Sequence, residues 1–261
     1  MNRFIATMMT VLPICMCIEG CKTTEEVEPE PKGSYTYAVV VGMENSRFAG
    51  SCPGARYDAM RMSQLLTKYT DNVKTFIDGA ATKAAVKAAL ADAISKAGNG
   101  LVIFYYSGHG GSEPFPDTGM EEVDGMDEFL CLWDTYFRDN EIWSEIRKSR
   151  GRVMWITDSC HSETQFRSPG FVLTPPLAWD HKLNETQPFS LLCWSGCPDG
   201  TYSYGSSTGG QFTNALLRHL QATDTYDVLW EKIKGDKTLR RYEDPQSTAI
   251  GNGFDGKPIF R

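Results

Sequence analysis

The chain has 261 residues, 41% of them hydrophobic, which is enough to bury the core of one large domain or of two small ones. It carries 26 basic and 33 acidic residues, a net charge of -7. This balance disfavours a general nucleic-acid-binding protein, which needs a basic face, so we expect no nucleic-acid partner. It is compatible with a site that attracts a cationic substrate.

Residues 1–20 have the pattern of a targeting segment. Arg3 precedes an apolar run of about fifteen residues, too short for a confident membrane span. The run leads into IEGC, which resembles the end of a bacterial lipoprotein signal, with Cys21 as the lipidated first residue. An ordinary signal peptide and an uncleaved anchor are the alternatives, and all three place the body outside the cytoplasm. We therefore expect an exported protein, lipid-anchored to a bacterial membrane on its periplasmic side or at the cell surface.

The next segment, 21–34, is rich in Glu and Pro and too poor in apolar residues to pack, so it is expected to be a tether. Beyond it, apolar runs alternate with helical patterns. Thr82 can cap one of these helices. This alternation predicts a mainly parallel sheet with helices on both faces. The expected strands are 36–43, 73–77, 100–108, 152–159, 189–196 and 257–260; the expected helices are 55–70, 83–97, 140–148 and 212–220, with an acidic loop before the third helix.

Two strand ends carry residues suited to nucleophilic catalysis. Functional groups in parallel sheets gather beyond the carboxyl ends of the strands, where YYSGHG reaches His109 and ITDSCH reaches Cys160. A catalytic cysteine attacks as thiolate and needs a nearby base. Neighbouring residues of an extended chain point to opposite sides, so His161 is poorly placed to be that base. We expect His109 to act on Cys160 and His161 to be structural.

Glycines flank the predicted base. Gly108, Gly110 and Gly111 allow close approach of a substrate backbone, and amides near Gly110 and Cys160 are candidates for an oxyanion site. Taken alone, however, a cysteine at a strand end is most often a small buried apolar residue. That interpretation is kept for the remaining cysteines of the predicted domain, which are Cys52, Cys131, Cys193 and Cys197.

These motifs together resemble a known family. YYSGHGG, followed by DSCHS with the cysteine 51 residues after His109, is similar to the caspase-hemoglobinase fold peptidases, most closely metacaspases and bacterial caspase-like proteins. In caspases the histidine likewise precedes the cysteine by about fifty residues. The resemblance implies an α/β, three-layer fold with a mainly parallel six-stranded sheet and helices on both faces. It covers about residues 35–261, with a large-subunit-like part at 35–167, a long connection at 162–188 and a small-subunit-like part at 189–261.

The resemblance also implies a specificity pocket. Metacaspases cut after Arg or Lys, and their acidic pocket positions resemble Asp58, Ser107 and Asp158 of this chain. Two carboxylates and a hydroxyl can hold a guanidinium through charge-assisted hydrogen bonds. The alternative interpretations are a solvated helix residue for Asp58 and a strand-end hydrogen-bond acceptor for Asp158.

Two further family features are matched less closely. Calcium sites of metacaspases resemble the positions of Asp124, Asp139 and Asn140, but Asn140 replaces an acid and Arg167 stands where a fourth acid is expected. We therefore expect that no cofactor is required and that calcium is a disfavoured alternative. Some relatives are cut in the long connection, where Arg167 and Lys182 would suit the enzyme's own pocket.

The sequence thus predicts a cysteine endopeptidase that cuts peptides or proteins after Arg or Lys with a His109–Cys160 dyad. No carboxylate is evident as a third member. Two alternatives stay open: a non-catalytic exported lipoprotein that uses the fold as a binding module, and a relative that cuts after Asn or Asp. The oligomeric state is left open as well.

Overall fold

The computed structural model of the protein describes residues 35–114, 126–159, 188–197, 205–221, 223–241 and 243–261. All of them belong to one compact unit, Lys32–Arg261. The predicted signal segment, the tether and Cys21 lie outside the described residues. No helix among the described residues is both long enough and apolar enough to cross a membrane.

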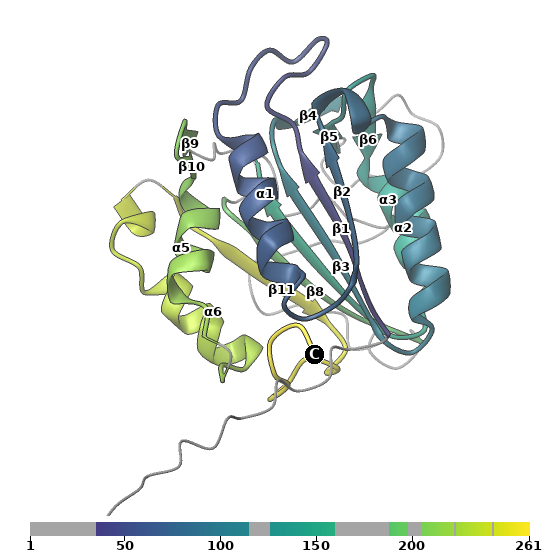
Figure 1. Ribbon diagram of the computed structural model, residues 1–261, viewed down its shortest axis with the longest axis vertical. Helices are drawn as coiled ribbons and strands as arrows, with labels where there is room; N and C mark the ends of the chain where they lie inside the picture. Colours follow the sequence, from purple (N-terminus) through teal and green to yellow (C-terminus); the bar gives the residue numbers. More distant parts are fainter. Residues whose placement is uncertain (1–34, 115–125, 160–187, 198–204, 222, 242) are drawn as a thin grey trace, which may run out of the picture. The chain divides into compact units, whose positions relative to one another are not determined.

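A sheet of six described strands forms the centre of the domain (Figure 1). Its spatial order is β11-β8-β7-β3-β1-β2. The edge strand β11 runs antiparallel to β8, and the other neighbours are parallel. The predicted α/β fold with a mainly parallel sheet is therefore confirmed. The strands are β1 (Thr36–Gly42), β2 (Asn72–Ile77), β3 (Leu101–Ser107), β7 (Arg152–Asp158), β8 (Ser190–Ser195) and β11 (Gln246–Ile250).

Helices cover both faces of this sheet and make three layers (Figure 1). The first face packs against α1 (Ala55–Leu66), α5 (Gln211–His219) and α6 (Tyr226–Lys234). The second face packs against α2 (Lys83–Ala97) and α3 (Asp139–Ile146). Thr82 caps α2 as predicted, because its hydroxyl accepts a hydrogen bond from the amide of Ala85 at 3.3 Å.

The sequence builds these layers through strand periodicity. Along β1, Val39 and Val41 belong to the core beneath α2, whereas Ala38 and Val40 belong to the core beneath α1. Because side chains alternate along a strand, an unbroken apolar run fills both cores at once. The buried runs predicted at 100–108 and 152–159 behave in the same way and place β3 and β7 in the middle of the sheet.

The predicted strand at 257–260 is wrong, since the sixth strand is β11. Pro258 has no amide hydrogen for a ladder, and Phe260 adopts a left-handed φ of 56°. The apolar side chains of Ile259 and Phe260 instead fill the core and are 0% exposed. The sequence of β11, QSTAI, buries only alternate residues and is too weakly apolar to stand out.

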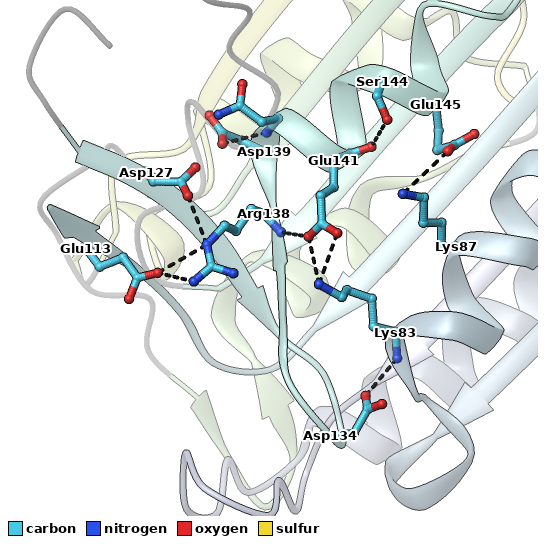
Figure 2. A network of polar contacts seen from close by, with 11 residues as sticks. Lys83, Lys87, Glu113, Asp127, Asp134, Arg138, Asp139, Glu141, Ser144 and Glu145 are labelled. Carbon is cyan, nitrogen blue, oxygen red and sulfur yellow. Dashed lines mark hydrogen bonds and ion pairs between the residues drawn. The ribbon is translucent and has the colours of Figure 1, made fainter. Parts of the chain in front are cut away.

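The predicted acidic loop is also wrong. The segment contains a small antiparallel sheet of β4 (Gly110–Pro114), β5 (Met126–Cys131) and β6 (Tyr136–Arg138), with 115–125 outside the described residues. Arg138 explains how acidic strands pair (Figure 2). Its guanidinium contacts Glu113 of β4 and, at 3.0 Å, Asp127 of β5. The like charges of the two acids are thereby offset.

The helix α6 was not predicted. The hydroxyl of Thr225 accepts a hydrogen bond from the amide of Val228 at 3.4 Å, and Leu229 and Ile233 are buried four residues apart. These are ordinary helix signals. With only nine residues, the helix offers little periodicity to read.

Candidate active site

The carboxyl ends of β3 and β7 lie side by side in the middle of the sheet. Their parallel register pairs Ser107 with Asp158. The pairing continues one step further, because the amide of Gly108 donates to the carbonyl of Asp158 at 3.3 Å. The register therefore places Gly108 at the level of Ser159, and His109 is the next residue on the chain that leaves β3. This is the place where the sequence predicted the catalytic residues to meet.

A cavity of about 110 Å³ opens at these strand ends. Its volume equals that of about four liquid waters, so it suits one side-chain head group rather than a longer peptide segment. Among the described lining residues, Asp158 is the one carboxylate, and none is Lys or Arg. The lining comes from β3, β7, the loop after β1 and the hairpin of β9 (Gly205–Ser206) and β10 (Gly209–Gly210): Cys52, Pro53, Ala55, Ser107, Gly108, His109, Asp158, Ser159, Gly205 and Gly210.

The imidazole of His109 is oriented by a backbone group. Its Nε2 lies 3.2 Å from the carbonyl oxygen of Ser51. A carbonyl oxygen can only accept a hydrogen bond, so Nε2 is the protonated nitrogen and Nδ1 is left as the basic one. No third carboxylate was expected beside the dyad, and here a carbonyl takes the orienting position. Sequence reasoning missed Ser51 because a carbonyl is common to every residue and leaves no signature.

The loop that carries Ser51 is tied to the end of β2. Asn45 and Ser51 form an antiparallel bridge across this loop. The amide of Asn45 donates to Asp78 Oδ1 at 2.8 Å, and Arg56 Nη2 of α1 lies 2.5 Å from Asp78 Oδ2. Burial acts to raise the pKa of Asp78, but the hydrogen bonds from Arg56 and Asn45 outweigh it and hold the pKa below its usual value. Asp78 is therefore an ionised anchor for the loop.

The side chain of Tyr106 contacts the backbone of the turn between β3 and β4. The hydroxyl of Tyr106 lies 2.7 Å from the carbonyl of His109 and 2.8 Å from that of Cys131. The amide of Cys131 donates to the carbonyl of His109, which makes Gly110 and Leu130 a non-hydrogen-bonded pair of the β4–β5 ladder. In such a pair the amides point away from the partner strand. The Gly110 N–H is consequently not used by β5, as an oxyanion donor requires.

The two pocket acids are both buried. Asp58 on α1 is 0% exposed and Asp158 is 5% exposed, so Asp58 is not a solvated helix residue. Asp58 Oδ2 accepts hydrogen bonds from Ser107 Oγ at 3.1 Å and from the amide of Gly210 at 2.7 Å. Asp158 Oδ2 accepts from the amide and hydroxyl of Thr213, in the first turn of α5, at 2.8 and 2.7 Å. Of the two acids, Asp158 lines the cavity and Asp58 lies behind it.

Burial raises the pKa of Asp58 to about 7, and the negative charge of Asp158 acts in the same direction. The hydrogen bond from Gly210 and the charge of Arg61 oppose this rise. Asp158 has a different environment, because the amino end of a helix favours an ionised carboxylate.

Two of the predicted calcium positions, Asp139 and Asn140, are not among the described residues that line this cavity. Asp139 is the first residue of α3 and is 0% exposed, and its Oδ1 accepts a hydrogen bond from the amide of Asn140 at 2.6 Å (Figure 2). Asp124 lies outside the described residues. Within the described part of the chain, no three His, Cys, Asp or Glu side chains are grouped so as to hold a metal ion.

Three predicted functional residues fall in the segment 160–187, outside the described residues. They are Cys160 and the two proposed self-cleavage positions, Arg167 and Lys182. The last described residue before this segment is Ser159, which lines the cavity and is 1% exposed.

The caspase domain family matches residues 36–236. The chain belongs to this family. Its members are cysteine peptidases, which is the chemistry that the motifs around His109 and Cys160 predicted. The match covers β1 to α6 and therefore includes all described residues that line the cavity.

Solved structures agree with this assignment. Protein GSU0716 from Geobacter sulfurreducens is 27% identical, with a TM-score of 0.64 over 85% of this chain and 94% of that one. Caspase-1 from Spodoptera frugiperda is 13% identical, with a TM-score of 0.56 over 88% of this chain and 92% of that one, and supports the fold alone. A search of curated proteins gave no match.

Gly210 of β10 is expected to be essential for the cavity wall. A Cβ on Gly210 would lie 2.1 Å from Asp158 Oδ2, whereas a Cβ on Gly205 would meet nothing nearer than 3.5 Å. Gly210→Ala should lower the free energy of unfolding by about 1–3 kcal/mol, because the hairpin must move away from both acids. Urea denaturation measures this, with Gly205→Ala as the matched control. Equal losses in the two variants would contradict the expectation.

Proposed function

We propose that the protein is a cysteine endopeptidase that cuts after Arg or Lys with a His109–Cys160 dyad. The observation that carries this proposal is the cavity at the ends of β3 and β7, which His109, Asp158 and Ser159 line together. Cys160 follows Ser159 directly in the chain. Membership of the caspase domain family supports the cysteine peptidase chemistry.

The first half of the reaction forms an acyl-enzyme. His109 takes the Cys160 thiol proton on Nδ1, since Nε2 already holds its proton and donates to Ser51. The thiolate sulfur then bonds to the scissile carbonyl carbon, and the carbonyl electron pair moves onto oxygen. The resulting oxyanion receives hydrogen bonds from the amides of Gly110 and Cys160. The carbonyl of Ser51 stabilises the imidazolium while it carries the positive charge.

The second half releases the products. The carbon–nitrogen bond breaks as the His109 imidazolium gives its Nδ1 proton to the leaving amine, and a thioester on Cys160 remains. Water then attacks the thioester with His109 as base, which releases the acid and returns the proton to the Cys160 sulfur. No step uses a metal ion, and turnover in the presence of a calcium chelator tests that expectation.

Specificity for a basic residue follows from the charge of the cavity. Asp158 offers a carboxylate, and the described residues that line the cavity include no lysine or arginine that could pair with an acidic substrate side chain. Gly205 and Gly210 form part of the wall without side chains, which leaves room for a long substrate stem. A guanidinium or an ammonium is favoured here, and Arg over Lys because its planar fork engages a carboxylate through two donors.

The dyad is tested by removing each member. Cys160→Ala should abolish peptide hydrolysis, and His109→Ala should lower kcat by about 100-fold or more, because the proton transfers lose their base. Rates of iodoacetamide labelling supply an independent readout, with Cys160 expected to react faster than Cys52, Cys131, Cys193 and Cys197. Normal turnover by Cys160→Ala would end this assignment. A wild type that binds peptides but never cuts them would favour the binding-module alternative.

Specificity is tested with peptides that differ only in the residue before the cut. Asp158→Asn should lower kcat/KM for an Arg peptide by about 100-fold, because it removes the charge that faces the guanidinium, and should affect a Gln peptide far less. Asp92→Asn is the matched control, since Asp92 pairs with Lys74 on the outer side of α2. A wild-type preference for Asp or Asn peptides would overturn the specificity while leaving the dyad intact.

We also propose that the protein is exported and lipid-anchored through Cys21. The basis is the sequence of residues 1–34, with its apolar run, its IEGC and the Glu- and Pro-rich tether. Cys21→Ser should shift the protein from the membrane fraction to a soluble or unprocessed form, as measured by fractionation and mobility on gels. Unchanged processing and membrane association in this variant would contradict the anchor, and Cys52→Ser is the matched control.

A further inference from the structure

The acid behind the cavity already has a positively charged partner within the protein. Arg61 lies one helical turn after Asp58 on α1, and its Nη2 is 2.5 Å from Asp58 Oδ1. The same nitrogen is 2.8 Å from the side-chain oxygen of Asn214 on α5. The guanidinium also stacks over the ring of Tyr57, with its carbon 4.5 Å from the ring centre. Contacts from three sides therefore fix this cation next to the buried acid.

The hairpin between β9 and β10 closes over this ion pair. A Cβ on Gly209 would lie 2.1 Å from Asp58 Oδ1 and 2.5 Å from Arg61 Nη2, and Gly209 has a φ of 103° that favours glycine. The side chain of Arg61 is 25% exposed, whereas that of Asp58 is 1% exposed. The pair is therefore largely shielded from water, where opposite charges act strongly on each other.

The groups that face Asp58 come from every element packed around it. Ser107 and Thr213 carry hydroxyls that do not ionise. Tyr105 is neutral as well, because burial raises its pKa well above its usual value. The charged groups that act on Asp58 are Asp158 and Arg61. When both acids are ionised, the charges of Asp58, Asp158 and Arg61 sum to one negative charge. A substrate residue with one positive charge balances that sum.

We propose that Arg61 is a specificity-determining residue, which sets the charge of the substrate pocket from inside the protein. The inference rests on the proposed preference for Arg or Lys before the cut. Arg61 does not line the cavity, so it acts on the substrate through the field of the pocket and not by contact. By offsetting one of the two carboxylates, Arg61 limits the net charge that attracts a cationic substrate side chain to one negative charge.

The sign of the effect follows from protonation of the buried acid. The pKa of Asp58 is raised to about 7, first by burial and then by the charge of Asp158. Below that pH Asp58 is neutral, Arg61 offsets Asp158, and the three side chains sum to zero. Above that pH the sum is one negative charge. Selectivity for a basic residue is therefore expected to rise as the pH rises through about 7.

Loss of Arg61 should change this pattern in a counterintuitive direction. Arg61 lowers the pKa of Asp58, so its removal raises that pKa further. At acidic pH the variant keeps one negative charge on Asp158 with no cation to offset it. Removing the positive partner of Asp58 should therefore improve discrimination in favour of basic substrates at low pH, although it removes an ion pair.

The test is the ratio of kcat/KM for two peptides that differ only in Arg or Gln before the cut, measured on the full chain from about pH 5.5 to pH 9. Any effect of pH on the steps that both peptides share cancels in the ratio. The wild-type ratio should rise about tenfold or more across pH 7, as one unit of charge implies. Arg61→Met should already show the high ratio at about pH 6, and Arg61→Lys, which keeps the charge, should behave as the wild type does.

A second set of variants keeps the test decisive if Arg61→Met does not fold. Asp58→Asn should hold the ratio at the low wild-type level at every pH, because Arg61 then offsets Asp158 permanently. Asp58→Asn combined with Arg61→Met should restore a high ratio that no longer depends on pH. Failure of the double variant to exceed Asp58→Asn would overturn the inference, with circular dichroism showing that both are folded.

The outcomes also separate this inference from the proposed function. If Arg61→Met lowers kcat/KM equally for both peptides and keeps the rise across pH 7, Arg61 is structural and the inference falls, while the proposed specificity stands. If the wild type shows no preference for Arg over Gln at any pH, the proposed specificity falls and the inference falls with it.

Discussion

The parallel register of β3 and β7 is the constraint on which the rest of the site depends. Because Ser107 lies opposite Asp158, both strands end at one level and deliver His109 and Ser159 to the same cavity. The core fixes this register, since Phe104 and Trp155 are also opposite each other and their stacked rings have centroids 3.8 Å apart. A slip of one residue would turn every side chain of a strand to the other face. The geometry of the cavity is thus maintained by packing in the core of the sheet.

The pocket at the ends of these strands contains two buried carboxylates, and burying charge is unfavourable. Two carboxylates are buried near each other, and each is retained only because several donors replace the water that it has lost. The donors come from β3, β10 and α5, so the two acids connect three segments of the chain. Glycine at 209 and 210 lets the backbone itself approach the carboxylates. The burial of the two acids and the conformation of the hairpin therefore depend on each other.

Much of this could be predicted from the sequence, and the failures have physical reasons. The apolar runs of the central strands and the strand-end position of His109 specified the sheet and the place of the site. The strand β11 was missed because its residues are short and polar, while Ile259 and Phe260 looked like a strand but fill the core. The carbonyl of Ser51 has no sequence signature, and the pairing of Arg61 with Asp58 depends on the hairpin that covers them. The sequence pattern predicted individual strands and helices, whereas it did not predict contacts between segments that are distant in the chain.

The order of the strands along the chain has a consequence for biosynthesis. The strands β2, β1, β3 and β7 are neighbours in space and are all translated before β8 and β11, which add to the open edge of β7. The amide of Gly210 and the hydroxyl of Thr213, which donate hydrogen bonds to the two acids, are made after β8 and before β11. A nascent chain can therefore assemble its central sheet while its carboxylates are still exposed to water. A chain interrupted before Gly210 would therefore hold most of the strands of the sheet but lack these donors to the two acids.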